Sequence, residues 1–275
     1  MKHLIKLVIV VCSMFVLHSQ GLSAQSTSAE RAFERGITAY NNEQYAEALP
    51  YLKQAALAGV PKAYKPLISL YVNGDYDGSD KGNYKEAFSW LLKALDKYMS
   101  GASDDQDLTV ACIMYYDPLC FLTGDYQETV DHATKAYSNG LPVQAFLMNQ
   151  IAASYLKLGN RAKANEWLTK AIALATEEGE TLNIYTSYAI LSKIAMDNKD
   201  YSKALDLSVE AASKGEIPLA AYVLGVCMIK TNYHPEIGQK WVKLAAEYDY
   251  GGISEINCFE NEIKQYWYSI KDLSF

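Results

Sequence analysis

Apolar residues along most of the chain recur every three or four places, which is the spacing of an amphipathic helix. They come in pairs of stretches separated by short polar turns. Leu147, Ile151 and Tyr155 share one helical face, for example, and the turn Lys157–Asn160 follows them. The strict alternation typical of strands is scarce. The pattern therefore predicts an all-α protein built from helical hairpins.

A second pattern recurs six times and predicts the second helix of each hairpin. A short polar turn leads to an aromatic residue or a substitute, a small residue follows three places later, and an alanine stands seven places beyond that. Steps of three and seven return to one helical face, and small residues there let a neighbouring helix approach closely. The copies are Tyr45, Ala48 and Ala55; Tyr84, Ala87 and Ala94; Tyr126, Thr129 and Ala136; Arg161, Ala164 and Ala171; Tyr201, Ala204 and Ala211; and Pro235, Gly238 and Ala245.

These segments resemble two related families of helical repeats. Residues 124–140 (GDYQETVDHATKAYSNG) and 158–174 (LGNRAKANEWLTKAIAL) look like second helices of tetratricopeptide repeats. Residues 55–71 (AALAGVPKAYKPLISLY) and 210–228 (EAASKGEIPLAAYVLGVCM) are similar to Sel-one-like repeats. The resemblance covers about residues 29–252. It implies a right-handed superhelical solenoid of about six hairpins that binds another macromolecule.

The end of the chain, residues 253–275, carries a narrow apolar stripe that steps by three and four places. We interpret it as a capping helix that covers the last hairpin, because terminal repeats need such a cover. The alternative is an exposed helix that docks into a partner. The stripe consists of Ile253, Ile256, Phe259, Ile263, Trp267 and Ile270.

The start of the chain reads as a secretory signal peptide over residues 1–24. Lys2 and Lys6 are followed by the apolar run Leu7–Leu17 and by the small-residue exit Leu22–Ala24. The run is shorter than the roughly 20 residues that span a bilayer as a helix, and no other long apolar run follows. We therefore expect a periplasmic or secreted protein without stable membrane insertion, with its repeat domain over residues 25–252.

The charge balance argues against nucleic acid as a partner. The whole chain has a formal net charge of −7. Removing Lys2 and Lys6 with the leader leaves 23 basic and 32 acidic residues, a formal charge of −9. Binding to phosphate backbones needs clustered lysine and arginine, whereas the basic residues here are scattered. We expect a protein or peptide partner.

Candidate catalytic chemistry is sparse, so we expect no enzymatic activity and no cofactor. His132 and His234 are the only histidines after the leader, and neither belongs to a catalytic or zinc-binding motif. The acidic cluster of Glu177, Glu178 and Glu180 fits a solvated helix end. A remote alternative is an enzyme acting on envelope polysaccharide, which would need two carboxylates facing each other across a cleft.

One loop resembles a calcium site in part. Asp75, Asp77, Ser79 and Glu86 occupy places one, three, five and twelve of that pattern. The sixth place is Asp80 and not the glycine that the sharp turn requires. We therefore predict weak calcium binding or none, and no metal site.

The four cysteines after the leader match no metal-binding spacing. Cys112 and Cys120 are eight residues apart on one helical stretch, too far for a disulfide in a straight helix. A bridge between Cys227 and Cys258 is possible if the sixth hairpin packs on the capping helix.

The repeat register also places a partner site. In tetratricopeptide proteins, first-helix side chains three places before, one place after and four places after the small packing residue point into a concave groove. The packing positions in this chain are Gly36, Ile68, Asp117, Ala152 and Gly225. The groove residues that follow are Phe33, Tyr40, Lys65, Met114, Phe121, Asn149, Leu156 and Tyr222. Aromatic anchors with a few amides and lysines suit an extended or helical peptide.

We therefore expect an exported scaffold that binds a protein or peptide in its concave groove. The alternative is a structural or regulatory component of a cell-envelope assembly, bound through its outer faces or ends. The first hypothesis places aromatic and amide side chains on the first helices. The second requires a large apolar patch on second helices or on the cap.

Overall fold

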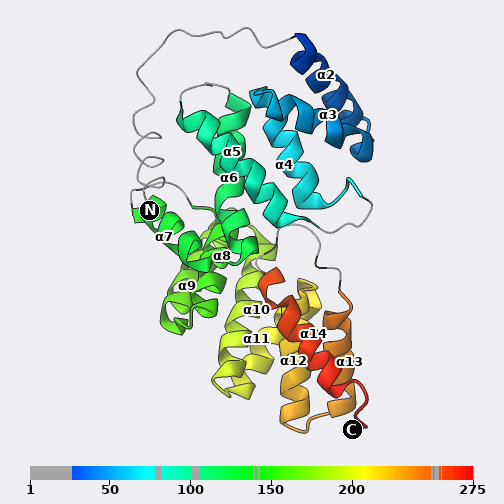
Figure 1. Ribbon diagram of the computed structural model, residues 1–275. Coiled ribbons are helices and arrows are strands. Elements are labelled where there is room, and N and C mark those ends of the chain that lie inside the picture. Colours follow the sequence, from blue (N-terminus) through cyan, green and yellow to red (C-terminus); the bar gives the residue numbers. More distant parts are fainter. Residues whose placement is uncertain are drawn as a thin grey trace. The chain divides into compact units, whose positions relative to one another are not determined.

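The computed structural model describes residues 27–77, 82–100, 106–138, 140, 143–248, 250, 254 and 256–274. Every regular element in these ranges is a helix, so the prediction of an all-α protein is confirmed for the described chain (Figure 1). None of the described helices is long and apolar enough to cross a membrane. The predicted signal peptide, residues 1–24, lies outside the described residues.

The chain divides into two compact units, with the boundary between Thr123 and Gly124. Each unit consists of helices packed on their neighbours in sequence. The first unit contains α2 (Thr27–Asn41), α3 (Tyr45–Leu57), the short 3-10 helix η1 (Pro61–Ala63), α4 (Tyr64–Asn73), α5 (Tyr84–Met99) and α6 (Gln106–Thr123).

The second unit holds the remaining hairpins and the C-terminal helix. Its tightest helix pairs are the hairpins α8–α9, α10–α11 and α12–α13, as the repeat pattern predicts. The elements are α7 (Tyr126–Ser138), α8 (Ala145–Lys157), α9 (Arg161–Glu178), α10 (Thr181–Asp197), α11 (Tyr201–Lys214), α12 (Pro218–Lys230), α13 (Pro235–Ala246), η2 (Asn257–Phe259) and α14 (Glu260–Ile270).

The repeat pattern marks the first residue of all six second helices, which begin at Tyr45, Tyr84, Tyr126, Arg161, Tyr201 and Pro235. A polar residue just before four of these helices explains where they start. Its side-chain oxygen accepts a hydrogen bond from the backbone N–H three places on, which satisfies one of the free donors of the first turn. These capping residues are Asn83, Asp125, Asn160 and Asp200.

The small residues of the pattern are buried, as their proposed packing role requires. Each described one has at most 1% of its surface exposed or falls in the buried class; Ala136 lies outside the described side chains. The buried set is Ala48, Ala55, Ala87, Ala94, Thr129, Ala164, Ala171, Ala204, Ala211, Gly238 and Ala245.

Two of the predicted packing positions are glycines because neighbouring backbones approach closely there. A Cβ atom added to Gly225 on α12 would lie 2.4 Å from the carbonyl oxygen of Gly238 on α13. A Cβ atom on Gly36 of α2 would lie 2.9 Å from Cγ of Leu52 on α3. Real Cβ atoms do not come this close to other heavy atoms, so both helix pairs depend on the missing side chain.

The third repeat departs from the register. Ile68 and Ala152 are fully buried, but Asp117, taken as the packing residue of α6, is half-exposed. A charged carboxylate favours contact with water, so this position does not serve as a close packing point. The boundary between the two units falls between α6 and α7, the two helices that the pattern pairs as the third hairpin.

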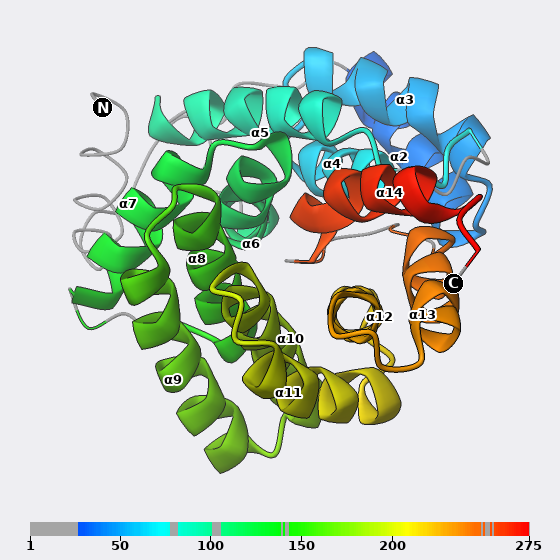
Figure 2. The same ribbon diagram turned by 90° about the horizontal axis from the view of Figure 1, so that it is seen from below.

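Four residues of the C-terminal stripe are buried and Trp267 is half-buried, but the stretch contacts more helices than the last hairpin alone. Ile256, Phe259, Ile263 and Ile270 are at most 7% exposed, whereas Ile253 lies outside the described residues. Besides α13, the stretch that ends in α14 contacts the first helices of earlier hairpins in its own unit. Figure 2 views α12 nearly end-on, with α14 running across its axis.

The thiols of Cys112 and Cys227 are free and buried. The bridge considered between Cys227 and Cys258 is therefore not formed, and Cys112 is not joined to Cys120. Burial raises the pKa of both the Cys112 and the Cys227 thiol to about 12. Burial also raises the pKa of the Tyr222 and Tyr250 phenols.

These raised pKa values predict a loss of stability at alkaline pH. The folded state holds the two thiols protonated, whereas the unfolded chain releases their protons above about pH 9. The free energy of unfolding should therefore be steady below pH 9 and fall as pH rises toward 12. Urea unfolding at a series of pH values measures it. A Cys112→Ala, Cys227→Ala variant should show a shallower fall, and an unchanged slope would contradict the assignment.

Candidate functional site on the inner helices of the first unit

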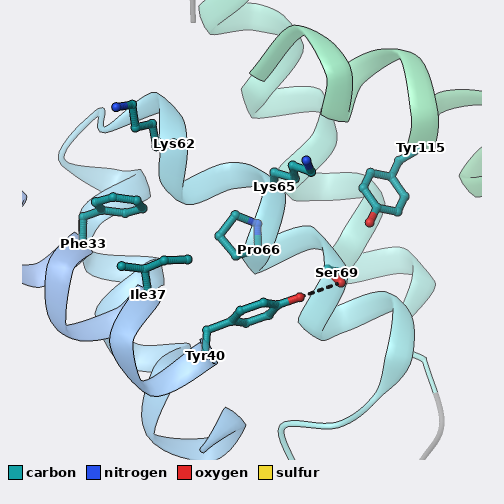
Figure 3. A pocket seen from close by; sticks show the side chains of 8 residues that line it. All are labelled: Phe33, Ile37, Tyr40, Lys62, Lys65, Pro66, Ser69 and Tyr115. Carbon is teal, nitrogen blue, oxygen red and sulfur yellow. Dashed lines mark hydrogen bonds between the residues drawn. The ribbon is translucent and has the colours of Figure 1, made fainter. Parts of the chain in front are cut away.

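A hollow of about 460 Å³ opens on the first unit, between helices α2, α4 and α6 (Figure 3). These are the first helices of the three repeats in this unit, the helices that the register assigns to a binding groove. Pro66 forms part of its floor and is buried. The lining residues are Phe33, Ile37 and Tyr40 from α2, Lys62 from η1, Lys65, Pro66 and Ser69 from α4, and Tyr115 from α6.

The sequence of α2 explains why its aromatic residues face the hollow. Phe33, Ile37 and Tyr40 are spaced by four and three places and so share one face of the helix. The neighbouring face carries Ala32, Gly36 and Ala39, all small and buried. Gly36 lets α2 approach Leu52 of α3, which leaves the larger side chains to face away from that contact.

Hydrogen bonds and ring contacts hold the aromatic side chains in place. The Tyr40 hydroxyl lies 3.2 Å from Oγ of Ser69 and bonds to it, as the dashed line in Figure 3 shows. The Tyr40 ring packs edge-on against the ring of Tyr45, with 5.6 Å between centroids. Burial raises the pKa of the Tyr115 phenol, and a hydrogen bond with Ser69 partly offsets this. Tyr115 therefore stays protonated at neutral pH and can donate a hydrogen bond.

The hollow carries positive charge without an acidic side chain among its lining residues. Lys62 is exposed at the rim, and no ion pair of Lys62 is formed within the described ranges. Lys65 is half-buried and projects toward the side of the hollow where Tyr115 lies (Figure 3). Aromatic walls beside two ammonium groups suit an apolar or aromatic side chain with a nearby carboxylate.

Three of the eight predicted groove residues meet in this hollow: Phe33, Tyr40 and Lys65. Leu156 is half-buried on α8 in the other unit, and the side chain of Met114 lies outside the described residues.

Three further predicted groove residues are buried, so the prediction that they line an open groove is wrong. Phe121 is 1% exposed, Asn149 0% and Tyr222 4%. The Asn149 amide donates to the backbone carbonyl of Asn183 and accepts from the Ser187 hydroxyl. Asn149 therefore joins two helices of its unit and is not available to a partner.

Five lining residues were missed, and two of them obey the same register. Ile37 and Ser69 each follow a packing position by one place. Tyr115 lies two places before Asp117 and is offset because the third repeat departs from the pattern. Nothing in the repeat register marks Lys62 or Pro66.

The other residues considered for catalysis or metal binding do not come together in the described part of the chain. His132 lies in α7 and His234 in the exposed turn before α13, as predicted. Glu177, Glu178 and Glu180 are exposed at the end of α9. The described residues contain no cluster of three or more histidine, cysteine or carboxylate side chains that could hold a metal ion.

The calcium-like loop can be followed only in part. Asp75 and Asp77 lie in the turn after α4, whereas Ser79 and Asp80 are outside the described residues. Glu86 lies in the first turn of α5, where its carboxylate accepts a hydrogen bond from the Trp90 indole.

A second hollow, of about 700 Å³, lies on α3 and α5, the second helices of the first unit. Leu57 and Leu92 line it and are 71% and 48% exposed. The Trp90 ring also lines it, with Nζ of Lys93 3.9 Å from the ring centroid. Its apolar residues lie beside Lys93, Lys97 and Asp96, so the charged part of its lining has both signs.

Comparison with protein-family models and with curated protein sequences finds no match to this chain.

Proposed function

We propose that this protein is an exported helical-repeat scaffold of the tetratricopeptide and Sel-one-like kind, without enzymatic activity, that binds a protein or peptide partner. Its hairpins would stack as a right-handed superhelical solenoid. The partner would lie against the inner faces of the first helices, and the hollow of the first unit is its main contact. The signal-peptide pattern of residues 1–24 supports a periplasmic or secreted location.

The observation that carries this proposal is the composition of the hollow. Three consecutive first helices contribute to it, and they present aromatic rings beside lysines without a carboxylate. Rigid aromatic side chains provide large contact area at low entropic cost, and they dominate the energetics of many interfaces. We therefore propose a peptide segment with an apolar anchor for Phe33 and Tyr40, and a carboxylate for Lys62 at the rim.

A second candidate function rests on the outer hollow. Its exposed Leu57 and Leu92 form the kind of apolar patch on second helices that an envelope assembly would bind. In that case the protein would be a structural or regulatory component held through its outer face.

The two functions are separated by substitutions in each hollow. The mature protein, used as bait on its own envelope fraction, should retain its partner through the inner hollow. Tyr40→Ala and Lys65→Glu should each weaken retention by about 1 kcal/mol or more, roughly fivefold or greater, because each removes a central contact. Mass spectrometry quantifies the retained proteins.

Lys85→Glu is the matched control, since Lys85 is an exposed lysine of α5 outside both hollows. It should behave as the wild type. Unchanged retention in Tyr40→Ala and Lys65→Glu, together with loss in Leu57→Asp, would move the site to the outer face. Circular dichroism checks that each variant keeps its helical content.

A further inference from the structure

In the second unit, the C-terminal segment, residues 256–273, runs across the first helices in the order in which they occur. Nζ of Lys157, at the end of α8, lies 4.5 Å from the ring centroid of Phe259. Nζ of Lys193 on α10 lies 3.1 Å from Oε1 of Glu262. The segment thus begins at the first hairpin of α8–α13 and crosses toward the last.

The later half of the segment continues the crossing. The ring of Tyr222 on α12 packs edge-on against that of Tyr266, with centroids 5.7 Å apart. Gln239 on α13 donates from Nε2 to the backbone carbonyl of Ile270, at 2.9 Å. Figure 1 shows α14 crossing in front of α12 next to α13, and Figure 2 shows it on one side of α12 with its end near α13.

Two of the contacted residues occupy groove positions of the repeat register. Tyr222 is one of the predicted groove residues. Ser192 is fully buried and stands nine places before Tyr201, as Gly36 stands before Tyr45, so Lys193 follows a packing position by one place. The segment therefore lies on the face of the second unit that corresponds to the open hollow of the first.

The contact combines apolar burial with a buried charge. Ile263 is fully buried, and Phe259 is 2% exposed. Lys193 is 5% exposed and pairs with both Asp197 and Glu262. Glu262 adds a second carboxylate to the buried Lys193–Asp197 pair, so an acidic residue at this place in the segment is complementary to the face.

The helix of this segment is also short. α14 has 11 residues, fewer than the roughly 12 to 15 that an isolated helix needs to be even marginally stable in water. α14 is therefore held in place by its contacts with the helices that it covers. Displacing it loses only those contacts.

We propose that the C-terminal segment is a resident ligand of the second unit, and that the face beneath it binds an amphipathic helix of a partner by displacing this segment. The partner helix has the chemistry of the resident: an aromatic residue, an acidic residue three places on with an aliphatic residue next to it, and a second aromatic residue three places after the aliphatic one. This surface is distinct from the hollow of the first unit and does not depend on the function proposed for it.

A synthetic peptide tests this surface directly. It carries residues 254–275 with Cys258→Ser and a fluorescent label, and it is titrated into the full mature chain. The wild-type chain should bind it weakly, because the tethered segment competes at high effective concentration. An Ile263→Asp chain should bind it at least about tenfold more tightly, because the substitution weakens only the resident segment and leaves the face intact.

Asn261→Asp is the matched control, since it adds the same charge to the exposed side of α14. That chain should bind the peptide as weakly as the wild type, and a peptide that itself carries Ile263→Asp should not bind either chain. A helical Ile263→Asp chain that binds the peptide no better than the wild type does would overturn the proposal.

Hydrogen exchange on the wild-type chain decides the matter even if Ile263→Asp does not fold. Amides of α14 should exchange at least about tenfold faster than those of α12, because a displaceable segment opens without unfolding the unit. Equal protection of the two helices would show that α14 is a fixed part of the unit and would also overturn the proposal.

Discussion

Gly225→Ala is expected to lower the free energy of unfolding of the second unit by about 3 kcal/mol, the upper range for overpacking a tight site. The new Cβ would lie 2.4 Å from the Gly238 carbonyl oxygen and 2.9 Å from the Val242 backbone nitrogen. Because both atoms belong to the backbone, α12 and α13 would have to move apart. Helix propensity alone predicts the opposite sign, a gain of about 1 kcal/mol.

Thermal unfolding followed by circular dichroism measures this effect, and a fall in midpoint of roughly 10 °C is expected. The double variant Gly225→Ala, Val242→Ala is the informative control. It removes the side-chain clash with Val242 Cγ2 at 2.8 Å but leaves the clash with the Gly238 carbonyl. Stability restored to the wild-type level in the double variant would show that backbone approach is not the cause.

Gln150→Leu is expected to raise the free energy of unfolding by about 2 kcal/mol. Gln150 on α8 is fully buried, and neither its Oε1 nor its Nε2 has a hydrogen-bond partner among the described residues. Burying a polar group without a partner costs about 1 to 3 kcal/mol, and leucine of similar size removes that cost. Urea unfolding at neutral pH measures the difference.

The neighbouring residue provides a control with the same burial. Asn149 is also fully buried on α8, but it makes hydrogen bonds of 3.1 Å to the Asn183 carbonyl and 2.7 Å to the Ser187 hydroxyl. Asn149→Leu should therefore destabilise the unit by about 2 kcal/mol. If both substitutions change stability in the same direction, hydrogen bonding does not explain either effect.

The helical elements could be predicted well because their determinants are local. Tyr84, Arg161 and Tyr201 each begin a helix at the position that the spacing indicates. A capping side chain, a turn and a small residue three places on all lie within a few residues of each start. Such signals do not depend on what the finished hairpin packs against.

The candidate site could be predicted only in part, because exposure depends on more than one hairpin. The register places Phe33 and Tyr222 at equivalent positions of their first helices. Phe33 lines an open hollow, whereas Tyr222 is covered by Tyr266. Sequence spacing within a repeat contains no information about a segment that returns from the end of the chain.

The position of Tyr115 was missed for a different reason. The register counts from a buried packing residue, and Asp117 is half-exposed. A carboxylate avoids burial, so the face that α6 presents is shifted from the one that the count assigns. The acidic residue at an expected packing position is the feature of the sequence that indicates this shift.

The path of the C-terminal segment also has a consequence for the order of folding. Each hairpin joins residues that are close in sequence, whereas the contacts of Phe259 with Lys157 and of Glu262 with Lys193 close long loops of chain. Loop closure costs entropy, and contacts of high sequence separation form slowly. The hairpins of the second unit are therefore expected to form first, and their inner face to remain accessible to other chains until the segment docks on it.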